Sequence, residues 1–158
     1  PYLGNEASVA EVFADGGGRS VYMDARGLAY AWAGNRTSSW SANDGSTFTP
    51  PAASPVREDA TFGCSAGLLS SADGKLLFLS EPAGPGRVGL TVHCSRDGGH
   101  TWPFSQVVGG AQNAAAYSAM RLVKDADGKQ DRILVVWEPK PYGNMYASTI
   151  NYDFCAEQ

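Results

Sequence analysis

The sequence predicts an all-β chain, and three observations carry this prediction. Apolar residues spaced with the 3.6-residue period of a helix are nearly absent. Short runs rich in Val, Ile, Leu, Tyr and Phe recur instead, separated by clusters of Gly, Asp, Asn and Ser, a pattern typical of strands joined by hairpins. The 158 residues include 19 Gly and 9 Pro, with 11% aromatic residues. This composition favours many short strands and tight turns.

Ten strands are expected, each a short run of β-forming residues closed by a turn. The turns are clearest at residues 14–18, 72–75 and 125–129, where Gly and Asp tolerate a positive φ. The proline-rich segment 49–59 is expected to be a connector, because proline cannot donate to a strand ladder. In chain order, the expected strands are residues 8–13, 20–24, 28–32, 37–41, 66–70, 76–80, 89–95, 117–122, 132–137 and 145–151.

Charge and hydropathy argue against a nucleic-acid partner and against a membrane-spanning helix. Lys and Arg number 12 and Asp and Glu 16, which gives a formal net charge of −4. The chain has no run of basic residues, so a nucleic acid held by phosphate neutralisation is not expected. The unbroken apolar runs, among them residues 28–33 and 133–137, are far too short to cross a bilayer as a helix. The length suits one ordinary domain with a sizeable core.

The cysteines and one sequon give limited information. Cys64, Cys94 and Cys155 are widely spaced, and no CxxC or histidine-rich pattern makes them a metal site. Neither a metal nor an organic cofactor is expected, and buried thiols are favoured over disulfides. The sequon at Asn35 permits glycosylation in the secretory route. It favours a lysosomal or secreted protein and leaves a cytoplasmic or membrane-associated one open.

One turn pattern occurs twice. Residues 95–102 have the form S-x-D-x-G-x-T-W, and residues 41–48 repeat it with Asn for Asp and Phe for Trp, 54 residues earlier. A period of roughly 40 to 50 residues in an all-β chain indicates propeller blades of four strands each. A structural role in hairpin turns is expected for Ser41, Asn43, Gly45, Phe48, Ser95, Asp97, Gly99 and Trp102.

These turns resemble the Asp box, or BNR repeat, of sialidases. Six further segments of the chain have the same order as in the carboxyl-terminal half of exo-α-sialidases. The resemblance is greatest to animal lysosomal and cytosolic neuraminidases and their bacterial relatives. The segments are residues 5–12 (NEASVAEV), 23–26 (MDAR), 63–68 (GCSAGL), 87–91 (RVGLT), 115–118 (AAYS) and 137–138 (WE). The resemblance implies about three four-stranded blades of a six-bladed β-propeller, so that residues 1–158 form a partial sialidase domain.

The resemblance also implies how the substrate carboxylate is held. Sialic acid carries a carboxylate on its anomeric carbon, and the planar guanidinium of arginine is the bidentate donor suited to it. Arg26 and Arg87 match two members of the arginine triad of the family. Glu138 matches a glutamate that orients a triad arginine before substrate arrives. A solvated strand end is the alternative interpretation of Glu138.

A tyrosine and a glutamate match the residues of the family that attack the sugar. A carboxylate nucleophile would approach the anomeric carbon against like charge, whereas a phenol is neutral until it reacts. The pKa of a free tyrosine is about 10, so the phenol needs a neighbouring base. The resemblance assigns Tyr117 as nucleophile and Glu6 as that base. Two departures, Ala7-Ser8 where a polar pair is frequent and Asp24 where Asn is common, leave the substrate preference open.

Two parts of the family site have no match in the chain: the first triad arginine and the aspartate that protonates the leaving group. Together with the start at Pro1, this predicts a fragment that is inactive alone and has the missing amino-terminal half of the propeller as its partner. The expected reaction is hydrolysis of terminal sialic acid from glycoproteins, oligosaccharides or gangliosides, with retention. A sialic-acid-binding propeller without hydrolysis and a BNR-repeat interaction protein are the alternatives.

Overall fold

The computed structural model describes residues 4–13, 18–27, 35–57, 63–139 and 141–156, and within them the chain is all-β. Eleven strands are described, followed by a 3-10 turn, η1 (Asp153–Cys155). None of the described helical segments has the length and apolarity needed to span a membrane. The strands are β1 (Gly4–Phe13), β2 (Arg19–Gly27), β3 (Asn35–Ser41), β4 (Ala52–Arg57), β5 (Gly67–Ser70), β6 (Leu77–Gly84), β7 (Val88–Ser95), β8 (Phe104–Val107), β9 (Ser118–Lys124), β10 (Asp131–Trp137) and β11 (Tyr146–Ile150).

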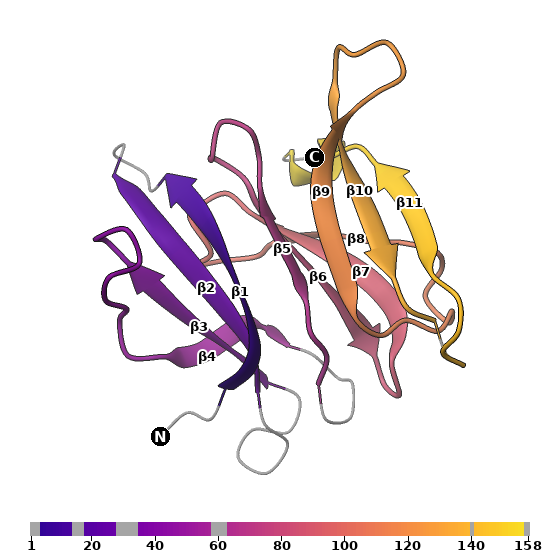
Figure 1. Cartoon of the computed structure of the whole chain (residues 1–158), viewed down its shortest axis with the longest axis horizontal. Coiled ribbons are helices and arrows are strands. Elements are labelled where there is room, and N and C mark those ends of the chain that lie inside the picture. Colours follow the sequence, from indigo (N-terminus) through magenta and orange to yellow (C-terminus); the bar gives the residue numbers. More distant parts are fainter. Residues whose placement is uncertain (1–3, 14–17, 28–34, 58–62, 140, 157–158) are drawn as a thin grey trace.

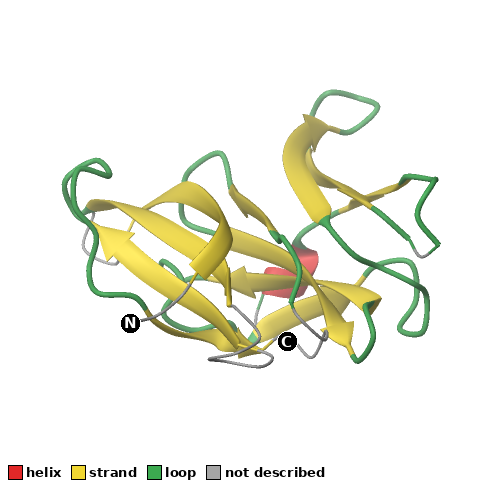
Figure 2. Ribbon diagram, turned by 60° about the horizontal axis from the view of Figure 1, so that its bottom comes forward, coloured by secondary structure: helices red, strands yellow, loops and turns green. Residues whose placement is uncertain are grey.

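The strands form three antiparallel sheets that follow one another in the chain (Figure 1). β1 to β4 form the first sheet and β5 to β8 the second, each as a simple meander. The third sheet holds β9, β10 and β11 among the described residues. The first strands of successive sheets meet, because β1 contacts β5 and β5 contacts β9. The sheets are therefore blades with their first strands innermost, as in a β-propeller (Figure 1). Figure 2 shows how strands and loops dominate the described chain.

Nine of the ten expected strands are present, with ends shifted by a few residues. The tenth, residues 28–32, lies outside the described residues. The prediction that residues 49–59 form a connector is wrong for Ala52–Arg57, which is β4. β4 is an outer edge strand, and its pairing with β3 is interrupted between Asn35 and Thr37. Pro55 is tolerated because it lies beside that irregularity, where no ladder hydrogen bond is lost. The short edge strand β8 was also not expected.

Apolar residues on the facing sides of the blades form the core. The interface of the second and third blades is the larger and contains Phe78, Leu90, Val92, Ile133, Val135 and Trp137. The first two blades meet through Val12, Tyr22 and Leu77. Side chains alternate between the two faces of a strand, so the apolar side chains on one face of a sheet pack against the neighbouring blade.

The two repeated turns have the same hydrogen-bond pattern. In the first, the amide of Gly45 donates to Ser41 Oγ at 2.9 Å, and the amide of Thr47 donates to Asn43 Oδ1 at 2.9 Å. In the second, Gly99 donates to Ser95 Oγ at 2.9 Å, and Thr101 donates to Asp97 Oδ1 at 2.8 Å. In both turns one side-chain oxygen accepts the backbone amide, so Asn43 can take the place that Asp97 has in the second repeat.

The final aromatic residues of the two repeats have different surroundings. Trp102 packs against Tyr22, with ring centroids 5.9 Å apart, and therefore joins the second repeated turn to the first blade. Trp40 of β3 joins the same two parts, because its indole N–H donates to the carbonyl of Gly98 at 2.8 Å. Phe48, which ends the first repeat, is half-buried.

A disulfide joins Cys94 of β7 to Cys155 of η1, with Cα atoms 5.9 Å apart. The expectation of buried thiols is therefore wrong for these two cysteines and holds for Cys64, which is buried and lies outside the disulfide. The pair is 61 residues apart in the chain, and η1 packs back near β8. Only this tertiary return brings the two thiols together, so their sequence spacing gives no sign of it.

Candidate functional site

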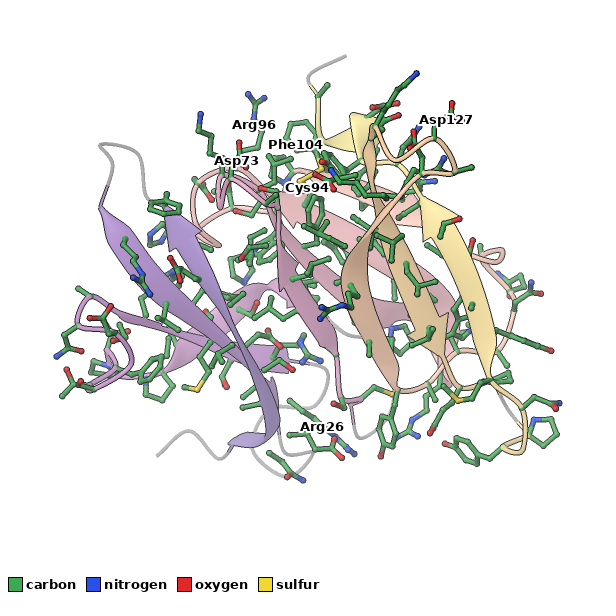
Figure 3. The ribbon with its side chains drawn as sticks, turned by 45° about the horizontal axis from the view of Figure 1, so that its top comes forward. Arg26, Asp73, Cys94, Arg96, Phe104 and Asp127 are labelled. Carbon is green, nitrogen blue, oxygen red and sulfur yellow. A yellow bond between two sulfur atoms is a disulfide. The ribbon has the colours of Figure 1, made fainter. Side chains whose placement is uncertain are left out.

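Four of the residues expected to act on the substrate converge at one end of the blades. Glu6 lies in β1, Arg26 in β2, Arg87 in the turn before β7, and Tyr117 directly before β9. Figure 3 shows Arg26 at the end of the sheets opposite the end that carries Cys94. The meander topology explains the convergence, because the antiparallel strands of each blade begin or end at this same edge.

Glu6 and Arg26 form an ion pair across the first two strands. Arg26 Nη1 donates to Glu6 Oε2 at 2.5 Å. Glu6 has a φ of 41° at the irregularity in pairing between Asn5 and Ala7, a left-handed conformation that is rare for a residue with a side chain. Such strain is found where the surrounding structure holds a functional side chain in place. Burial lowers the pKa of Arg26, but the hydrogen bonds to Glu6 and Tyr117 outweigh it and raise the pKa above its ordinary value.

Tyr117 lies between the two arginines. Arg26 Nη1 donates to the phenolic oxygen at 3.3 Å. The guanidinium carbons of Arg26 and Arg87 lie 5.9 and 5.2 Å from the centre of the tyrosine ring. Distances under about 6 Å are those of cation–π contacts. The phenol is thus held by two permanent cations that belong to different blades.

Backbone hydrogen bonds fix Tyr117 to the end of β10. The amide of Glu138 donates to the carbonyl of Tyr117 at 3.0 Å, and the amide of Ala116 donates to the carbonyl of Glu138 at 2.7 Å. The side chains of Tyr117 and Glu138 line one cavity of about 170 Å³ together with Met145. Among the described residues, no ion pair joins Glu138 to Arg26 or Arg87, so its role in orienting an arginine stays a prediction.

Arg87 is held by groups from two other segments. It has a φ of 66° in the turn between β6 and β7. Its Nη2 donates to the carbonyl of Gly63 at 3.0 Å, and its Nη1 donates to the phenolic oxygen of Tyr142 at 2.6 Å. Burial lowers the pKa of Arg87, but Cys64, Tyr117 and Tyr142 outweigh it and raise the pKa above its ordinary value.

Tyr142 is a residue of this site that the sequence did not indicate. It lies in the turn between β10 and β11 and is 55% exposed. It lines a cavity of about 270 Å³ together with Glu138, Asn144 and Met145. No local pattern marks it, because its contact with Arg87 spans 55 residues of chain.

A third cavity, of about 380 Å³, lies beside Glu6. Its walls combine the carboxylate and two other polar residues with four mainly apolar ones. They are Asn5, Glu6, Ala7, Met23, Ala25, Thr37 and Pro51.

The four central residues bring two cations, a phenol and a carboxylate into one cluster. Two guanidinium groups present charged N–H donors, the phenol of Tyr117 lies between them, and the carboxylate of Glu6 is paired with Arg26. Arginine pairs that meet in this way bind carboxylates or phosphates through charge-assisted hydrogen bonds. A phenol next to a carboxylate can act as a nucleophile if the carboxylate accepts its proton.

Comparison with solved structures defines the class of fold: the chain has a sialidase-like, all-β fold of propeller blades. The structure titled "Hadza microbial sialidase Hz136" is similar to it, with a TM-score of 0.61 and 25% sequence identity. The match covers 93% of this chain and 28% of the matched chain, so the chain spans less than a third of that structure. No protein-family model matches the chain. A search of curated proteins likewise finds no match.

Proposed function

We propose that the chain carries part of the active site of a retaining exo-α-sialidase, a glycoside hydrolase. The observation that carries this proposal is the contact of Arg26 with both Glu6 and Tyr117, while Arg87 covers the ring of Tyr117. These residues lie on three separate sheets or turns and were each expected from a separate motif. The similarity to a microbial sialidase supports the same reaction class.

In the proposed reaction, Arg26 and Arg87 bind the carboxylate on the anomeric carbon of a terminal sialic acid. The phenolic oxygen of Tyr117 forms a bond to that carbon, the phenolic proton passes to Glu6, and the bond to the leaving sugar breaks. An acid outside the four residues protonates the departing oxygen. Water then replaces the tyrosine oxygen at the anomeric carbon and gives one proton back to that acid, while Glu6 returns the phenolic proton to Tyr117. Two inversions give overall retention.

The position of Arg26 fits the order of these steps. Arg26 Nη1 lies within hydrogen-bond distance of both Glu6 and Tyr117, so it holds the base and the nucleophile together before substrate arrives. When the substrate carboxylate takes the donors of Arg26, the carboxylate of Glu6 becomes able to accept the phenolic proton. Hydrogen bonds in unliganded active sites often tighten only in the complex.

The remaining predictions on cofactors, partners and location belong to the same proposal. The reaction requires neither a metal nor an organic cofactor, and its substrate is a sialylated glycoprotein, oligosaccharide or ganglioside. The acid and a third arginine would come from further blades, the amino-terminal half of the propeller. The disulfide between Cys94 and Cys155 favours an oxidising compartment, hence a secreted or lysosomal protein.

The test is Tyr117→Phe in the full-length protein. Tyr146→Phe is the matched control, because it removes the same hydroxyl from a tyrosine of the same blade that is 48% exposed and packs edge-on against Trp137. With a fluorogenic sialoside, we expect Tyr117→Phe to lower kcat by at least about 100-fold and Tyr146→Phe to leave it within about twofold. NMR should show the α-anomer of sialic acid released first.

Two outcomes would contradict the proposal. Near-wild-type hydrolysis by Tyr117→Phe would remove Tyr117 as nucleophile, and first release of the β-anomer would exclude retention. Sialic acid binding without turnover by the wild-type protein would instead identify the non-hydrolytic binding propeller.

A further inference from the structure

A second, fully buried ion pair lies directly beside the candidate site. Asp24 of β2 and Arg36 of β3 have side chains that are 0% and 1% exposed. Arg36 Nε donates to Asp24 Oδ2 at 2.8 Å, and its Nη2 donates to the same oxygen. Removing one partner of such a pair leaves a buried charge uncompensated, which is strongly unfavourable.

The strand register explains why a carboxylate is needed at position 24. Arg26 and Arg36 stand directly opposite each other in the ladder of β2 and β3, where two like charges repel. Glu6 pairs with Arg26, and Asp24, two residues earlier on the same face of β2, pairs with Arg36. Each cation thus has its own carboxylate. This pairing is a physical reason for an Asp at position 24, where Asn is common in the family that the sequence resembles.

Arg36 also reaches the segment that holds Arg87. Its Nη1 donates to the carbonyl of Cys64 at 2.9 Å. The neighbouring carbonyl, that of Gly63, accepts the hydrogen bond from Arg87 Nη2 at 3.0 Å. Gly63 has a φ of 64°, a conformation that glycine adopts without strain. The buried guanidinium of Arg36 and the guanidinium of Arg87 therefore bind two adjacent carbonyls of one segment.

We infer that Asp24 and Arg36 are positioning residues for Arg87. Asp24 fixes the plane of the Arg36 guanidinium, and Arg36 holds the Cys64 carbonyl and thereby the position of the adjacent Gly63. The Gly63 carbonyl in turn orients Arg87 toward the substrate carboxylate. Neither residue touches substrate, since both are buried. The inference deepens the proposed function and rests on it for the identity of the anion. The hydrogen bonds that hold Arg87 do not depend on which anion binds.

The experiment is a double-mutant cycle in the full-length protein with Asp24→Asn and Arg87→Ala. Asn keeps the shape of Asp24 and removes its charge. If Asp24 acts through Arg87, Asp24→Asn should lower kcat/KM for a fluorogenic sialoside by about 10- to 100-fold in the wild-type background. It should change kcat/KM by less than about twofold when Arg87 is already absent. Equal losses in both backgrounds would overturn the inference.

Arg36→Lys gives a second test, because it keeps the charge opposite Asp24 and loses the planar donor that reaches Cys64. It should show the same loss as Asp24→Asn. Val12→Ala controls for stability alone, since Val12 is buried where the first two blades meet and no contact among the described residues joins it to Arg87. Below its unfolding temperature, Val12→Ala should leave kcat/KM unchanged.

A readout that needs no activity separates this inference from the proposed function. In protein labelled with 15N-arginine, the side-chain Nε–Hε resonance of Arg87 is identified by its loss in Arg87→Ala. We expect Asp24→Asn to shift or broaden this resonance and Val12→Ala to leave it in place. An unchanged Arg87 resonance in Asp24→Asn overturns the inference whether or not the protein hydrolyses sialosides. A shifted resonance in a protein that hydrolyses none supports the positioning and refutes the proposed function alone.

Discussion

The equivalent glycines of the two repeated turns should respond very differently to the same substitution. Gly45 and Gly99 both follow the Ser-x-Asp/Asn-x pattern and have φ values of 84° and 93°. Alanine at either position must adopt a left-handed backbone, which costs roughly 1–2 kcal/mol. A Cβ at Gly45 meets no heavy atom within 4 Å. Gly45→Ala should therefore lower the free energy of unfolding by the backbone cost alone.

A Cβ at Gly99 would instead lie 2.6 Å from Cε2 and 2.7 Å from Cδ2 of Tyr22. Tyr22 cannot move aside easily, because it is 0% exposed and packs against Trp40 and Trp102 at centroid distances of 5.3 and 5.9 Å. Overpacking of this kind costs a further 1–3 kcal/mol, roughly. Gly99→Ala should therefore cost about 2–5 kcal/mol in total.

Urea unfolding followed by tryptophan fluorescence measures both variants in the same background. We expect a lower midpoint for Gly99→Ala than for Gly45→Ala, with a difference in unfolding free energy of about 1–3 kcal/mol. Equal losses within about 0.5 kcal/mol would refute the reasoning, because they would mean that the second turn does not pack on Tyr22.

Two further predictions concern stability. Removing the Cys94–Cys155 disulfide by a double serine substitution should cost about 4 kcal/mol, the chain entropy expected for its separation of 61 residues, and urea unfolding with and without reductant checks this. An unchanged midpoint would contradict it. Burial raises the pKa of Asp97, but hydrogen bonds from Thr101 and Ser95 outweigh it and lower the pKa. Its stabilisation is therefore complete above the unfolded pKa of about 3.9 and is lost as the pH falls through the lower folded pKa. Asp97→Asn should make the urea midpoint less dependent on pH below about 4, and an unchanged acid dependence would refute this.

Local sequence patterns were sufficient for most of the strands and their order. Nine expected strands are present because each carries β-forming residues bounded by Gly, Asp or Ser. β4 was missed because its proline and the two that directly precede it indicated a connector, and only its place at an edge beside an irregular pairing makes Pro55 acceptable. β8 is a four-residue edge strand whose place is set by pairing with β7.

The residues of the candidate site, like the strands, were predicted from the sequence only in part. Glu6, Arg26, Arg87 and Tyr117 were indicated by motifs, and the structure places them together. Tyr142 was not indicated, because nothing near it in the chain distinguishes it from other exposed tyrosines. The family resemblance proposes an orienting role for Glu138, and the described contacts join its backbone, rather than its side chain, to Tyr117.

By itself, the sequence determined an all-β chain of repeated blades and a set of chemically suitable residues, because strand periodicity, turn chemistry and motifs are local properties. Only the tertiary structure decided that Cys94 pairs with Cys155 and that Gly99, unlike Gly45, lies against the ring of Tyr22. It also decided that the buried ion pair of Asp24 and Arg36 lies next to the segment that holds Arg87. Each of these depends on contacts between segments that are 24 to 77 residues apart, as with Gly63 and Arg87 or Tyr22 and Gly99. Such contacts are set by how the blades pack, so they cannot be predicted from any one segment of the sequence.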